Sequence, residues 1–115
     1  MSKPLPLLLN AFSISMVQLP STVRFEEVSL EEVKQIISEG FISAIGHQGT
    51  AQTLSELLGV QVPVNRAQVS LTKGQVAIVF QLMLRLAEGQ ILSSEEVKQL
   101  LAQGKAKFVK VTVLE

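Results

Sequence analysis

The sequence contains no cysteine, no tryptophan and no tyrosine, and it has a single histidine, His47. The absence of cysteine excludes disulfide bonds, thiolate metal sites and cysteine nucleophiles. A single histidine also argues against a zinc enzyme site within one chain, because such sites usually take two or three histidines. We therefore expect neither a metal nor a cofactor.

An excess of charge of one sign is missing as well. The 115 residues carry 10 basic and 10 acidic side chains, so the formal net charge is zero. Without a global positive field, long DNA or RNA is not an expected partner, and any anionic ligand must be held by local geometry.

Long hydrophobic runs are also lacking. The apolar N-terminal stretch is interrupted by Pro4, Pro6 and Asn10, and no signal-peptide cleavage site follows it. No segment approaches the roughly 20 apolar residues that span a bilayer. We expect a cytoplasmic protein with no membrane partner.

The chain does contain regular apolar patterns, which predict a single α/β (mixed α+β) domain over residues 1–115. We expect a central mixed sheet of about five strands with three helices packed on it. The predicted strand segments are 5–12, 22–28, 41–45, 67–71, 75–84 and 105–114, and the predicted helices are 29–40, 50–59 and 93–104.

Local signals support these elements. Ser29 and Glu32 form a capping-box pattern at the start of the first helix, and Gly59 ends the second. The first and third helices, SLEEVKQIISEG and SSEEVKQLLAQG, have nearly the same sequence. A duplication explains this as well as the features that many helices share, namely a cap, an amphipathic face and a final glycine. The turn TKG at 72–74 predicts a hairpin between segments 67–71 and 75–84, with the second strand central in the sheet.

Polar side chains gather in four short stretches of this apolar framework. Each has a purely structural alternative: His47 as a hydrogen-bonding residue at a strand–helix junction, Arg85 with Glu88 as a surface ion pair, and Asn65 as a turn residue. For Gln81 a functional role is harder to dismiss, because an amide without a hydrogen-bond partner in a buried strand would be costly. The four stretches hold Asn10 and Ser13, His47 to Thr50, Asn65 and Arg66, and Gln81, Arg85 and Glu88.

If these side chains converge, they suit a phosphodiester. His47 precedes the first turn of a predicted helix, whose free amides and positive dipole end favour an anion. Gly46 and Gly49 would let the backbone approach a phosphate closely. In RNA the substrate's own 2′-hydroxyl can attack, so one histidine would suffice as proton donor. These patterns alone indicate a small anion or nucleotide ligand.

The ordered motifs NAFS, IGH with Thr50, VPVNR, FQLMLRLAEG and LSSEEV resemble the ring nuclease family of archaeal viruses, phages and bacteria, from Leu8 to Leu114. The resemblance implies metal-independent cleavage of cyclic tetra-adenylate, the second messenger of type III CRISPR systems, to linear di-adenylates with 2′,3′-cyclic phosphate ends. It also implies a homodimer that binds the ring across its two-fold axis.

Carried over to this sequence, the resemblance implies that His47 is the general acid, that Glu88 assists or orients it, and that Arg85 belongs to the catalytic set. A viral member would silence immunity from the host cell cytoplasm, whereas a bacterial one would reset its own signal. The substrate-binding set implied by the resemblance comprises Asn10, Ser13, Gly46, Thr50, Asn65, Arg66 and Gln81.

Two other functions compete with this one. A small dimeric viral protein of DNA-binding or regulatory role is disfavoured by the neutral charge and the 4% aromatic content, which supply neither a phosphate-tracking stripe nor a stacking platform. A sponge that binds the cyclic nucleotide without cutting it would not need a proton donor, so His47 separates that function from cleavage.

Overall fold

The computed structural model describes residues 5–65, 69–82 and 93–114. Within these ranges the strands form one five-stranded mixed sheet in the order β2-β5-β4-β1-β3. This confirms the predicted fold class of a mixed sheet with three helices. The strands are β1 (Leu7–Leu9), β2 (Val23–Val28), β3 (Ile42–Ala44), β4 (Val76–Leu82) and β5 (Ala106–Val113).

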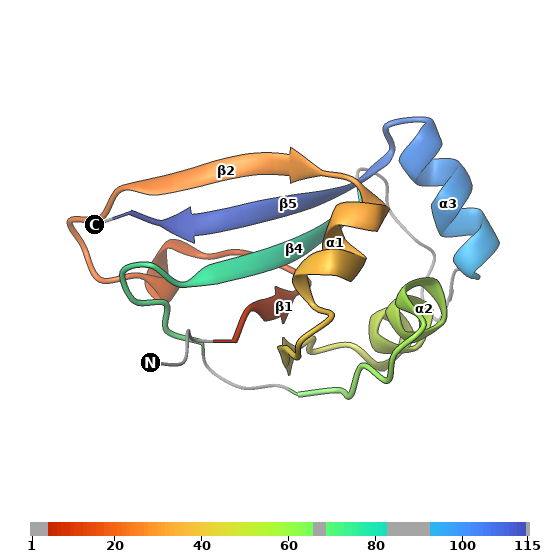
Figure 1. The fold of residues 1–115 in the computed structure, drawn as a ribbon, viewed down its shortest axis with the longest axis horizontal. Helices are drawn as coiled ribbons and strands as arrows, with labels where there is room; N and C mark the ends of the chain where they lie inside the picture. Colours follow the sequence, from red (N-terminus) through yellow and green to blue (C-terminus); the bar gives the residue numbers. More distant parts are fainter. Residues whose placement is uncertain (1–4, 66–68, 83–92, 115) are drawn as a thin grey trace.

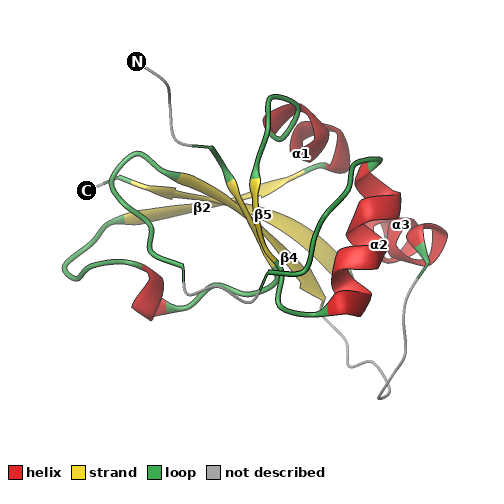
Figure 2. Ribbon diagram, turned by 90° about the horizontal axis from the view of Figure 1, so that it is seen from below, coloured by secondary structure: helices red, strands yellow, loops and turns green. Residues whose placement is uncertain are grey.

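Helices cover one face of the sheet, and a short 3₁₀ segment with its flanking loops lies over the other (Figure 1; Figure 2). Alternation along β1 explains why both faces are apolar. Leu8 packs in the core under the helices, whereas Leu7 and Leu9 pack in the core on the opposite face. The prediction of a strand buried on both faces is therefore confirmed for β1. The helices are α1 (Leu30–Ile36), α2 (Gln48–Leu58) and α3 (Ser94–Ala102), and the 3₁₀ segment is η1 (Ile14–Met16).

The capped start of α1 and the end of α2 follow the local signals, whereas the predicted helix 29–40 is too long. α1 ends at Ile36, because the N–H groups of Ser38 and Gly40 donate to carbonyls three residues back and form turns instead. In α1 the Ser29 hydroxyl accepts a hydrogen bond from the Glu32 N–H at 3.2 Å, and the Glu32 carboxylate accepts one from the Ser29 N–H at 3.2 Å. Gly59 follows α2 in the left-handed conformation, with φ of 71°, which glycine adopts without a steric penalty. Leu54, Leu57 and Leu58 of α2 are buried on one face, as predicted.

The predicted hairpin between segments 67–71 and 75–84 is wrong. Both edges of β4 are occupied by other strands, by β1 in parallel and by β5 in antiparallel orientation. Leu71 instead forms a parallel bridge with Val17, next to η1, and packs onto the sheet face. The turn itself exists, since the Gln75 N–H donates to the Thr72 carbonyl at 3.0 Å. A local turn signal does not specify whether its two arms pair.

No helix in the described ranges is long and apolar enough to cross a membrane.

Candidate functional site

Three neighbouring strands end at the same edge of the sheet. β1 runs parallel to both β3 and β4, with Leu9 in register with Ala44 on one side and with Val79 on the other. Residues of the predicted site therefore lie at the carboxyl ends of these strands: Asn10 after β1, Gly46 and His47 after β3, and Gln81 near the end of β4. Carboxyl ends of parallel strands are a common location for ligand sites.

His47 is the N-cap residue of α2. Its backbone is extended, with φ of −124° and ψ of 127°, and its carbonyl accepts the first helical hydrogen bond, from the Ala51 N–H at 3.0 Å. Its side chain is exposed and makes no capping hydrogen bond within the described chain. The predicted position of His47 before the first turn of a helix is confirmed, but α2 begins at Gln48, two residues earlier than the predicted start at residue 50.

The first turn of α2 lacks both kinds of group that normally satisfy a helix N-terminus. Neither a side-chain cap from His47 nor an acidic residue lies there, and the first turn contains Gln48, Gly49 and Thr50. Such a turn presents backbone N–H groups and the positive end of the helix dipole, which together favour an anion. Thr50 itself is half-buried.

The backbone before His47 is tied to β1. The Asn10 side-chain oxygen accepts a hydrogen bond from the Gly46 N–H at 3.3 Å, which brings two residues of the predicted set together. Neither Gly46 nor Gly49 has a positive φ. Any close approach of a ligand at these positions would therefore depend on the absence of a side chain and not on a left-handed backbone.

Asn65 contacts β3 with both its backbone and its side chain. Its Nδ2 donates to the Ser43 carbonyl at 2.6 Å, and its backbone N–H donates to the Ile45 carbonyl at 2.9 Å. Ser43 was not anticipated from the sequence. It is buried, and its hydroxyl donates to the Pro63 carbonyl at 2.6 Å. A serine between Ile42 and Ala44 in a short apolar strand was the signal that could have identified it.

Ser13 and Gln81 are engaged locally. Ser13 caps η1, and its hydroxyl accepts a hydrogen bond from the Ser15 N–H at 3.3 Å. The prediction that Gln81 is buried is wrong: the side chain is exposed, and its Nε2 donates to the Leu82 carbonyl at 3.1 Å. Ala77 and Val79 precede it on the same sheet face and are buried, so the cover of that face ends between Val79 and Gln81.

Arg66, Arg85 and Glu88 lie outside the described residues. The described part of the site therefore consists of the backbone and neutral polar groups around His47, while the charged residues of the predicted set belong to the rest of the chain.

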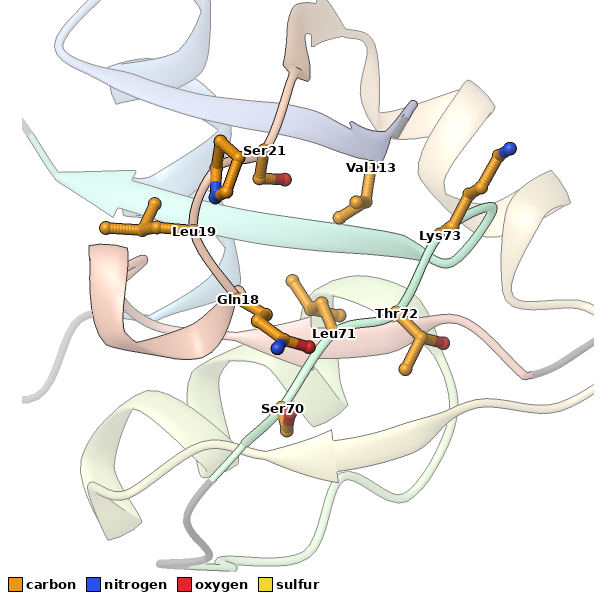
Figure 3. A pocket seen from close by; sticks show the side chains of 9 residues that line it. Gln18, Leu19, Ser21, Ser70, Leu71, Thr72, Lys73 and Val113 are labelled. Atoms are coloured by element: carbon orange, nitrogen blue, oxygen red, sulfur yellow. The ribbon is translucent and has the colours of Figure 1, made fainter.

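A cavity of about 420 Å³ lies elsewhere on the sheet, near the start of β2 and β4 and the end of β5 (Figure 3). Lys73 is the charged residue among the nine that line it, and Leu71 and Val113 are its buried apolar members. None of the predicted site residues lines this cavity. The candidate site around His47 is therefore distinct from this cavity.

Comparisons with known proteins identify relatives over most of the chain. A family model described as STIV B116-like matches residues 6–108. The uncharacterized protein ORF117 of Acidianus two-tailed virus is 47% identical over 88 residues, covering 74% of this chain and 75% of the relative. The uncharacterized protein YddF of Bacillus subtilis is 35% identical over 83 residues, covering 70% and 77%.

The fold is also found among solved structures. Protein B116 of Sulfolobus turreted icosahedral virus superposes with a TM-score of 0.81 at 34% sequence identity, covering 92% of this chain and 97% of that protein. Viral and bacterial proteins therefore share this sequence pattern.

Proposed function

The chain belongs to the STIV B116-like family, and on that premise we propose that it is a metal-independent ring nuclease that cleaves cyclic tetra-adenylate. The products are linear di-adenylates with 2′,3′-cyclic phosphate ends. The observation that carries the proposal is the position of His47: the chain's single histidine is exposed at the N-cap of α2, beside a first turn that has no side-chain cap from it and no acid. A phosphate held at that turn lies next to a proton donor.

The reaction needs little from the protein beyond geometry and one proton. The ribose 2′-oxygen forms a bond to phosphorus, the bond from phosphorus to the 5′-oxygen breaks, and the 2′-hydroxyl proton leaves to water. His47 donates a proton to the departing 5′-oxygen, which becomes a hydroxyl. Holding the 2′-oxygen in line with the leaving oxygen supplies a further part of the rate enhancement. Two such cuts convert one ring into two di-adenylates.

The other predicted residues have supporting roles in this proposal. Arg85 and Arg66 stabilise the negative charge that develops on the phosphate, and Glu88 orients or assists His47. Asn10 holds the Gly46 backbone, and Thr50 contributes its N–H in the first turn of α2. Ser13 and Gln81 face the ribose or the base edges.

We further propose that the active unit is a homodimer. The described residues leave eight large apolar side chains exposed, which is surface that a second copy can cover. A ring of four identical nucleotides has rotational symmetry, so a two-fold axis through the dimer presents two copies of His47 to two of its phosphates. The exposed side chains are those of Leu5, Ile14, Leu19, Phe25, Ile42, Val60, Val64 and Leu114.

This activity would switch off type III CRISPR signalling. The family includes proteins of archaeal viruses and a protein of Bacillus subtilis. In a virus the enzyme acts as an anti-CRISPR protein, and in a bacterial host it resets the cell's own signal.

Incubation with cyclic tetra-adenylate in EDTA, followed by chromatography, tests the proposal. Linear di-adenylates are the expected products. Tight binding of an intact ring would identify a sponge instead. Binding to duplex DNA with no affinity for the ring would favour the DNA-binding alternative.

A further inference from the structure

The chain has two asparagines: the side chain of Asn65 is hydrogen-bonded to Ser43 within β3, and that of Asn10 to Gly46, between β3 and His47. Asn10 comes from the inner side, at the end of the neighbouring strand β1. Asn65 comes from the outer side, where β3 is the edge strand of the sheet. The segment Ser43–Gly46 is therefore held between two side-chain amides, immediately before the proposed general acid.

Asn65 satisfies the outer edge of β3 as a strand partner would. Its side chain and its backbone N–H donate to the carbonyls of Ser43 and Ile45, two residues apart on one side of the strand. Val64 completes this arrangement with a parallel bridge to Ile45. An edge strand of three residues gains from such a partner two hydrogen bonds that fix its position.

The loop that carries Asn65 is also fastened to α2. The Val62 N–H donates to the Ser55 hydroxyl at 2.9 Å, and Ser55 in turn donates to the Ala51 carbonyl within the helix at 2.8 Å. The Ser43 hydroxyl adds a bond to Pro63. Residues 62–65 thus connect the two elements, β3 and α2, between which His47 lies.

We propose that Asn65 is a positioning residue for His47 rather than a substrate ligand, an inference that rests on the proposed ring nuclease function. Its Nδ2 already donates at 2.6 Å to a strand carbonyl, and its neighbours tie the same loop to the helix that begins after His47. Asn65 acts by fixing the backbone of residues 43–47, and so the distance from the imidazole to the leaving oxygen.

Asn65→Ala and Ser43→Ala test this role together, with Gln61→Ala as the matched control. Ser43 is buried within the sheet and holds the same loop by its own hydroxyl, so it should reproduce the effect without touching substrate. Gln61 is exposed in the same loop. Single-turnover cleavage at saturating ring is expected to slow by roughly 10- to 100-fold in both variants, with the dissociation constant for the ring within about threefold of wild type.

Hydrogen–deuterium exchange of the free protein supplies a readout that needs no cleavage. Asn65→Ala should speed exchange over residues 45–50, whereas Gln61→Ala should not. If one variant does not fold, the other decides. An unchanged single-turnover rate overturns the proposal. An affinity loss beyond about tenfold in Asn65→Ala that Ser43→Ala does not share also overturns it, because that pattern identifies Asn65 as a ligand. If wild type leaves the ring intact, the proposed function fails, and exchange alone decides whether Asn65 holds the segment.

Discussion

The N-termini of α2 and α3 are built in opposite ways. At α3 the Ser93 hydroxyl accepts a hydrogen bond from the Glu96 N–H at 3.2 Å, and the Glu96 carboxylate accepts one from the Ser93 N–H at 3.0 Å. Two glutamates, Glu95 and Glu96, stand in that first turn. At α2 the cap residue is His47, which makes no such bond within the described chain, and the first turn is neutral.

This difference separates stability from ligand binding. A side-chain cap contributes about 1 kcal/mol to helix stability, and acids in the first turn add a few tenths more. The same groups fill the positive end of the helix and would repel a phosphate. α1 repeats the closed arrangement with Ser29 and Glu32. Of these three helix ends, only that of α2 remains suited to an anion, and it is the one that carries the histidine.

The N-terminus of α2, which has no side-chain cap from His47, is called the open end below, and the capped N-terminus of α3 the closed end. The largest expected effect comes from removing His47 at the open end. His47→Ala should slow cleavage by roughly a hundred- to ten-thousandfold, because the leaving 5′-oxygen loses its proton donor. Binding of cyclic tetra-adenylate should persist, since it rests on backbone amides and other side chains. Single-turnover kinetics and titration calorimetry measure the two quantities. Near wild-type cleavage would contradict the role of His47, and loss of the fold would make it structural.

The second test removes an arginine, to measure how much of the phosphate charge the N-terminus of α2 stabilises without it. Arg85→Ala should reduce transition-state stabilisation or binding by about 2–4 kcal/mol, as for loss of a comparable charge-stabilising donor. Rates at saturating ring distinguish the two contributions. Unchanged rate and affinity would mean that Arg85 is only a surface residue.

A substitution at the capped N-terminus of α3 should change stability and leave cleavage unaffected. Ser93→Ala removes the α3 cap and should lower the free energy of unfolding by about 1 kcal/mol. Cleavage at a temperature well below the unfolding midpoint should stay unchanged. Urea denaturation measures the first effect. A loss of cleavage in the folded variant would show that the two helix ends are coupled.

The smallest expected effect comes from making α2 resemble α3. Gln48→Glu places a negative charge in the first turn of α2, which should stabilise the helix by about 0.3–1 kcal/mol and weaken ring binding by a few-fold, more so at low salt. Gln52→Glu, exposed one turn further along the same helix, is the control with the same charge change. Equal affinities in both variants would show that the phosphate is not held at the start of α2.

Short-range interactions explain the parts of the fold that could be predicted. The box of Ser29 and Glu32 joins residues three apart, and Gly59 stops a helix by its own conformation. The alternation in Leu7–Leu9 reflects the two-residue period of a strand. The position of His47 before a helix belongs to the same class, because the apolar spacing that follows it marks the helix.

Contacts between distant segments decided what the sequence pattern left open. Segment 67–71 and β4 had the composition of a hairpin, yet β1 and β5 occupy the two edges of β4. Gln81 lies in an apolar run of the sequence, which predicted burial. Its side chain is exposed because the segments that cover this face of the sheet end between Val79 and Gln81.

By itself, the sequence determined the capping boxes that start α1 and α3, the glycine that ends α2 and the two-residue period of the strands, since each depends on neighbours within a few residues. Tertiary structure decided that Asn10 and Asn65 hold the same segment. The hydrogen-bonded residues are far apart in the sequence: Asn10 and Gly46 are 36 positions apart, and Asn65 and Ser43 are 22 positions apart. A side-chain amide can bond any free backbone group within reach, and only the packed sheet selects which one lies there.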